Sequence, residues 1–114
     1  MGPGDLVVVS CGAPREKFWG VLLALDVAGA TLRGVPLEAF EDWMRQFLSA
    51  TPVLLGAVTL FLPAHRLERV ELDESGGGAE GFGDRFARMT GRDPVEALRT
   101  GARPQSSGDE RPER

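Results

Sequence analysis

The stretch from Gly4 to Val35 constrains the fold more than any other part of the chain, because its apolar residues fall in short runs with alternating positions. The three runs and their tight connections are Leu6–Cys11, Phe18–Asp26 and Ala30–Val35, with turns at Gly12–Pro14 and Ala28–Gly29. Short apolar runs punctuated by Gly and Pro are typical of consecutive antiparallel strands. We therefore expect three strands of a small, strongly bent sheet.

Two further strand patterns follow after an insertion. They cover Thr59–Phe61 and Leu67–Leu72, and one tight turn over residues 62–66 separates them. Five short strands in this order predict a sheet that closes on itself. The sequence thus predicts a mainly β chain with helices, an α+β fold, built on a five-stranded small barrel within a domain over residues 1–74.

The insertion between the third and fourth strands predicts an amphipathic helix over residues 36–48. Pro36 stands at the first turn, where helices accept proline. Apolar side chains then recur at helical spacing: Leu37, Phe40, Met44, Phe47 and Leu48. Trp43 lies just beyond one edge of this face, so we expect it at the border between core and solvent. The helix either caps the open end of the barrel or docks a partner, with Trp43, Phe40 and Phe47 as candidate partner-binding residues.

The rest of the chain divides into three segments. Residues 75–81 form a Gly-rich hinge, residues 82–102 carry two short helical patterns, and residues 103–114 are polar and predicted to be disordered. The first pattern has an apolar stripe of Phe82, Phe86 and Met89. The second begins with Asp93 as N-cap and Pro94 as the first helical residue. We expect these helices to pack back onto the barrel or onto a neighbouring subunit.

Residue types that carry catalysis or bind metals are sparse. The chain has one Cys and one His, Cys11 and His65, with no activating motif around either and no cluster of ligands at metal-binding spacing. The spacing Gly76-x-Gly78-x-x-Gly81 matches a dinucleotide-binding loop, but no βαβ pattern surrounds it. We therefore expect no catalytic residues, no cofactor and no metal site.

Charge gives a further constraint. The chain has 13 basic and 17 acidic residues, a net charge of −4, and lacks the basic stripe that nucleic-acid binders present. The acidic run Glu68, Glu71, Asp73 and Glu74 alternates with apolar residues, which predicts a solvated strand face.

The sequence also bears on location and source. No apolar run approaches the roughly 20 residues of a membrane helix, and the first residues lack a signal-peptide pattern. We therefore expect a cytoplasmic protein. Lys17 is the single Lys among the basic residues, and so strong a preference for Arg is typical of GC-rich bacterial coding.

The stretch from Gly4 to Val35 resembles the first motif of Sm-like proteins, which has a strand, a short turn and two further strands. Phe18, Trp19, Gly20 and Leu22 fill the second strand, Asp26 ends it, and Leu32-Arg33-Gly34-Val35 matches the third. The segment Leu62–Leu72 is similar to the end of an SH3-like or Sm-like barrel, in which a single helical turn separates the last two strands. The resemblance implies an SH3/Sm-like small β-barrel and, from the Sm-like family, RNA binding.

The chain departs from the Sm-like pattern in the loop after Asp26. Sm-like proteins carry there an Asn that helps to hold a base, whereas this chain has Val27-Ala28-Gly29-Ala30. The sequence therefore predicts a non-enzymatic interaction or assembly module with a protein partner or a second copy of itself. The alternative is an Sm-like RNA or nucleic-acid binder, for which Arg33, His65 and Arg66 are the candidate contacts. Neither function involves a membrane.

Overall fold

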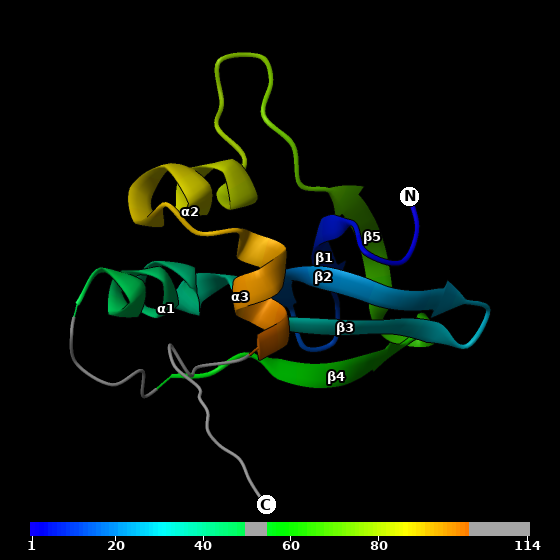
Figure 1. Ribbon diagram of the computed structural model, residues 1–114. Helices are drawn as coiled ribbons and strands as arrows, with labels where there is room; N and C mark the ends of the chain where they lie inside the picture. The colour runs from blue at the N-terminus through cyan, green and yellow to red at the C-terminus, as the bar shows by residue number, and fades with distance from the viewer. Residues whose placement is uncertain (50–54, 101–114) are drawn as a thin grey trace, which may run out of the picture.

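Over the residues that the structure describes, a five-stranded antiparallel sheet and three α-helices make up the fold, so the predicted α+β class is confirmed (Figure 1). The computed structural model describes residues 1–49 and 55–100. The strands are β1 (Leu6–Cys11), β2 (Glu16–Asp26), β3 (Gly29–Pro36), β4 (Val58–Pro63) and β5 (Leu67–Leu72). The predicted bounds of the first and last strands agree with β1 and β5, and the other three strands extend the predicted runs by one or two residues at one or both ends.

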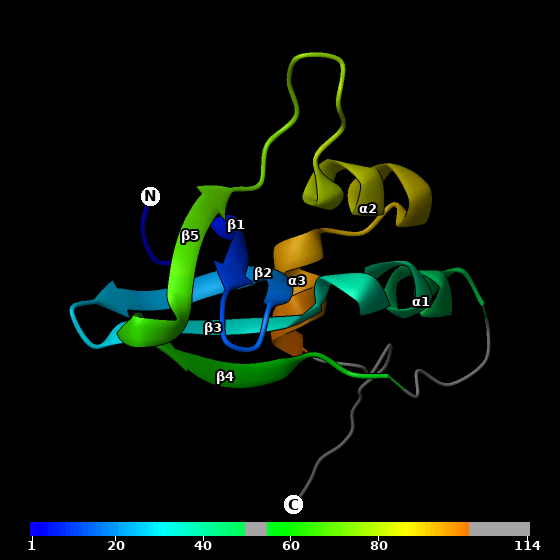
Figure 2. The same ribbon diagram turned by 180° about the vertical axis from the view of Figure 1, so that it is seen from behind.

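The sheet is open, which corrects the expectation of a closed barrel. Its strand order is β4-β3-β2-β1-β5, and no ladder joins β4 to β5 within the described ranges. The two outer strands are joined by the single turn η3 (Ala64–Arg66), as predicted, but they leave this turn in different directions (Figure 2). Because β4 and β5 diverge, their edges do not meet, and no other described strand pairs with either outer edge.

Alternation along the strands divides the apolar residues between two cores, one on each face of the bent sheet. The concave face buries the side chains of Val7, Val9, Cys11, Leu22, Ala30, Leu32 and Leu62. The other face is covered by the helices and buries Trp19, Val21, Val35, Phe40, Trp43, Met44, Ala57, Phe86, Ala97 and Leu98. Thus the sheet curls around one core and the helices complete a second.

The predicted insertion helix is present as three consecutive helical pieces. They are η1 (Leu37–Ala39), α1 (Phe40–Arg45) and η2 (Gln46–Leu48), with Pro36 as the last residue of β3. Two side chains lie opposite to expectation: Trp43 is 0% exposed, and Leu48 is 50% exposed. Trp43 is buried because Phe86, on a later helix, stacks on it at 5.0 Å between ring centroids and so covers the side of α1 that was expected to meet solvent.

The two C-terminal helices are present as predicted. They are α2 (Phe82–Thr90) and α3 (Pro94–Thr100). Gly91 ends α2 with a φ of 73°, in the left-handed region that favours glycine. The Asp93 carboxylate accepts a hydrogen bond from the Glu96 backbone N–H at 2.9 Å, which confirms the predicted N-cap. Residues 101–114, which include the predicted tail, lie outside the described residues.

Both C-terminal helices pack onto the same chain. Arg33 on β3 donates from Nε to the backbone carbonyl of Leu98 on α3 at 2.8 Å. Arg85 on α2 makes a two-pronged ion pair with Glu41 on α1, at 2.8 and 3.0 Å. These contacts support the first of the two packing alternatives, in which the helices cover the sheet of their own chain.

Asp73 makes a connection that the sequence reading missed, because we expected its carboxylate on a solvated strand face. Its Oδ2 accepts from the Trp19 indole N–H at 2.9 Å and from the Gly83 backbone N–H at 2.7 Å, while Oδ1 accepts from the Phe82 backbone N–H at 2.8 Å. Asp73 therefore satisfies the free N–H groups at the start of α2 and fixes that helix over the sheet.

We expect Gly20→Ala to destabilise the fold by about 1–3 kcal/mol through overpacking. Gly20 faces Gly34 across β2 and β3, and a Cβ at position 20 would lie 2.7 Å from the Gly34 Cα and closer still to the Arg33 carbonyl oxygen. Urea unfolding measures the effect, with Gly76→Ala as the matched control because nothing lies within 4 Å of its Cβ position. Equal stability of the two variants would contradict this close strand approach.

We expect Trp43→Ala and Phe40→Ala each to cost about 3–5 kcal/mol, because both remove a fully buried aromatic side chain. Trp43→Phe is expected to cost less than Trp43→Ala, since it keeps a ring on Phe86 and removes an indole N–H that has no acceptor among the described residues. Thermal and urea unfolding of the three variants test this. If Trp43→Ala were as stable as the parent, Trp43 would not be a core residue but would lie at the border between core and solvent.

The Glu41–Arg85 pair predicts a pH dependence of stability. The hydrogen bond from Arg85 lowers the pKa of the Glu41 carboxyl below its ordinary value of 4.5, so the folded state favours the charged form. The stabilisation is therefore present above that value and is lost as pH falls through the lowered folded-state pKa. We expect Glu41→Gln to be less stable than the parent at neutral pH and the difference to shrink in acid, whereas exposed Glu38→Gln is the control without this trend.

Candidate functional site

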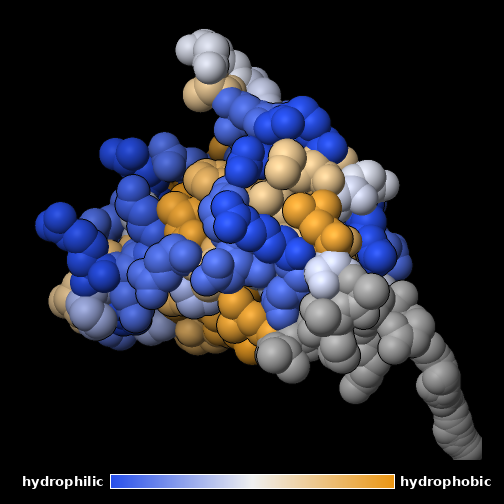
Figure 3. Space-filling model, turned by 90° about the vertical axis from the view of Figure 1, so that its left-hand side faces the viewer, coloured by the Kyte–Doolittle hydropathy of each residue, from blue (hydrophilic) through white to orange (hydrophobic). Residues whose placement is uncertain are grey.

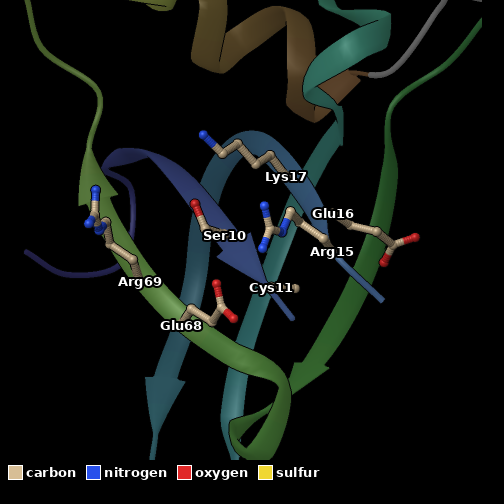
Figure 4. Close-up of a pocket in the computed structure, with 7 residues that line it drawn as sticks. All are labelled: Ser10, Cys11, Arg15, Glu16, Lys17, Glu68 and Arg69. Atoms are coloured by element: carbon tan, nitrogen blue, oxygen red, sulfur yellow. The ribbon is translucent and has the colours of Figure 1, made fainter. Parts of the chain in front are cut away.

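A polar groove of about 360 Å³ lies where β1, β2 and β5 meet. It is lined by Ser10, Cys11, Arg15, Glu16, Lys17, Glu68 and Arg69. Figure 4 shows β5 on one side and the start of β2 on the other, with the Glu16 carboxylate pointing away from the remaining side chains. Among the described residues, the Arg15 and Lys17 side chains make no ion pair or hydrogen bond, and the groove carries charges of both signs.

Cys11 lines this groove but is suited to packing rather than to reaction. Burial raises the pKa of its thiol, and the Arg66 guanidinium opposes only part of that effect. A thiol with a raised pKa is protonated at neutral pH and is a poor nucleophile. Within the described ranges, no hydrogen bond joins Cys11 to His65, and no group of three or more metal-ligating side chains gathers.

The candidate nucleic-acid contacts are not brought into one patch. Arg33 is held by the Leu98 carbonyl and lies 3.4 Å from the Thr59 hydroxyl. Arg66 donates to the carbonyls of Gly12 and Pro14, at 3.2 and 2.7 Å, and pairs with Glu16 at 3.0 Å. His65 is exposed on η3. Both arginines are therefore engaged by the protein's own acceptors, on different elements.

The candidate partner-binding residues are mostly internal. Trp43 and Phe40 are 0% and 1% exposed, so neither side chain is accessible in this conformation. Phe47 is half-buried, with the Arg92 guanidinium 5.3 Å from its ring centroid, and lines a shallow groove of about 290 Å³ beside α3. On the side where α1 and α2 lie, Figure 3 shows hydrophobic side chains in several separate groups among hydrophilic ones. The helical side thus offers no broad apolar face in this view.

The free edge of β4 is the surface that stands out. Its sequence, Val58-Thr59-Leu60-Phe61-Leu62-Pro63, contains no charged residue. Val58 and Phe61 are 50% and 53% exposed although both are large apolar side chains. Soluble proteins usually protect an edge strand of this kind from pairing, either with charged residues or by covering it with another element. The β4 edge has no charged residue, and no described residue covers it.

The backbone register shows which groups of β4 are free. The Ala64 N–H donates to the Ala28 carbonyl at 2.8 Å, which extends the β3–β4 register by one pair. Hydrogen-bonded pairs alternate along an antiparallel ladder, so Leu62, Leu60 and Val58 direct their backbone groups toward β3. Thr59 and Phe61 therefore direct their N–H and C=O groups outward. Pro63, next in this outward series, has no N–H and limits the bonding edge at that end.

The opposite edge, β5, carries the protection that β4 lacks. Glu68, Arg69 and Glu71 are exposed charged residues on β5, and a register shift lies beside Ser10 and Cys11 where β5 meets β1. Charges and irregular register both discourage pairing with another strand. The two edges of the same sheet therefore differ in their readiness to accept a strand.

Other exposed apolar side chains lie near the ends of β4. Leu55, shortly before the strand, is 40% exposed, and Val27, in the β2–β3 turn that meets the far end of β4, is 98% exposed. Sequence reasoning missed this surface because it placed only Thr59–Phe61 in a strand and assumed that the strand would be paired on both sides. The uncharged run was the signal that could have found it.

A scan against protein-family models and searches of curated proteins and solved structures found no match for this chain. The resemblance to Sm-like and SH3-like proteins therefore rests on the sequence motifs alone. Among the described residues, no helix is long and apolar enough to cross a membrane.

Proposed function

We propose that this protein is a non-enzymatic interaction module that accepts an extended strand along the free edge of β4. The observation that carries the proposal is the pair of outward N–H and C=O groups at Thr59 and Phe61, on an uncharged strand with exposed apolar side chains. Strand addition of this kind draws affinity from main-chain hydrogen bonds and specificity from alternate side chains.

The side chains around this edge suit an apolar partner strand. Leu60 and Leu62 are on the concave face of the sheet, and Phe61 is on the other face, where its ring lies close over Gly29. A strand paired with β4 would cover half-exposed apolar surface on both faces at once. Burial of such surface contributes roughly 25 cal/mol per Å² before the cost of ordering the partner.

We also propose that the sheet is related in architecture to SH3-like and Sm-like small barrels. The support is the predicted Phe18–Leu22 motif in β2, the strand order with β1 between β2 and β5, and the single helical turn between β4 and β5. The alternative function, Sm-like nucleic-acid binding, has less support because Arg33 and Arg66 donate to backbone carbonyls of their own chain.

A displayed library of short extended peptides, selected against the full chain, tests the proposed function. We expect selected peptides to be apolar at alternate positions and to bind roughly tenfold or more weakly to Phe61→Lys, because a charge on the edge opposes pairing. Leu72→Lys on β5 is the matched control, since Leu72 is also an exposed apolar residue of an edge strand, at 41%. Its binding should equal that of the parent.

Amide hydrogen exchange locates the bound peptide. In the free protein we expect fast exchange at Thr59 and Phe61 and slow exchange at Leu60 and Leu62, whose N–H groups already pair with β3. A bound peptide should slow Thr59 and Phe61 specifically. Binding without that protection would place the peptide elsewhere and contradict the proposal.

A further inference from the structure

We infer that the strand which pairs with β4 is β4 of a second copy, in an antiparallel arrangement about a two-fold axis at Leu60. The inference rests on the proposed strand-accepting function and names the partner. It is argued from the register of the free backbone groups, from the side chains they would bring together, and from the contrast with β5.

The free backbone groups are self-complementary in one register. A two-fold axis at Leu60 places Thr59 of one copy opposite Phe61 of the other, and both residues direct their N–H and C=O groups outward. Each of the two pairs can then exchange both of its hydrogen bonds. Pro63, which has no N–H, falls outside this central set, opposite Ala57. In this register the N–H groups of Thr59 and Phe61 each donate to a carbonyl of the other copy, and neither residue is opposite Pro63.

The side chains match in the same register. Directly opposed residues project from the same face of an antiparallel pair, so Val58 meets Leu62 and Leu60 meets its own copy on the concave face. Thr59 meets Phe61 on the other face. The strand has no charged residue, so no like charges are opposed within the paired segment even though the chain carries a net charge of −4.

Pairing of β4 with the β5 edge of another copy is the main alternative for self-association. It would place the uncharged strand against one with exposed Glu68, Arg69 and Glu71 and an irregular register. Such a head-to-tail contact leaves one free edge on each end and builds rings or filaments rather than dimers. The two arrangements therefore differ in the mass of the assembly.

Sedimentation of the full chain over a wide range of concentration tests the dimer. We expect a monomer–dimer equilibrium with no larger species. Phe61→Lys should weaken dimerisation roughly tenfold or more, while Leu72→Lys on the protected edge should leave it unchanged. Thermal unfolding of both variants shows whether each is folded.

Disulfide trapping tests the register. In a Cys11→Ser background, Leu60→Cys places two cysteines opposite each other at a non-hydrogen-bonded pair, with Cα atoms about 4.5 Å apart, within disulfide range. Mild oxidation should give a covalent dimer. Val58→Cys is the matched control, because its own copy lies four residues further along the pair, about 13 Å away, and it should stay unlinked.

The outcomes separate this inference from the proposed function. The protein could be monomeric at all concentrations and still bind selected peptides with slowed exchange at Thr59 and Phe61. That result would contradict the dimer and support the strand-accepting function. Species larger than a dimer, or trapping at Val58 instead of Leu60, overturn the two-fold register. A monomer that also binds no strand at β4 contradicts both.

Discussion

The hydrogen bond between the Trp19 indole and the Asp73 carboxylate is the contact on which the helical half of the molecule depends. Trp19 is a fully buried side chain of β2, and its ring packs on Phe40 and Trp43 of α1. The same carboxylate accepts the first backbone N–H groups of α2. Asp73, the residue directly after β5, thus fixes α2 over the aromatic cluster that covers the sheet.

This arrangement explains why the two faces of the sheet differ. The helices protect the face of Trp19, Val21 and Val35, whereas the concave face is closed by the curvature of the sheet itself. On the concave face, Val7, Val9 and Leu22 of the inner strands are fully buried, whereas the outer strands are only partly covered. The exposure of Val58 and Phe61 follows from their place on the last strand of an open sheet.

Local patterns in the sequence were enough to predict the strands and helices, because alternation, helical spacing and the Asp93 cap each act over a few residues. Long-range contacts could not be read in this way. Trp43 was expected at a border because its helix was considered alone, whereas Phe86, far along the chain, covers it. Asp73 was expected in solvent for the same reason. Whether the sheet closes depends on the angle between β4 and β5 at η3, and the sequence of residues 64–66 does not indicate that angle. The free edge of β4 could therefore not be predicted either.

Pro63 has a consequence for how far association can proceed. A strand edge with a complete row of N–H groups can add strand after strand, and an uncharged one is then a template for aggregation. Here the proline ends the row after Phe61, so the exposed edge offers a short, finite set of bonds. Once that set is occupied, the outer edge that remains on each chain is the charged β5. The sheet is in this sense self-limiting: it can recruit one strand and then presents a surface that resists the next.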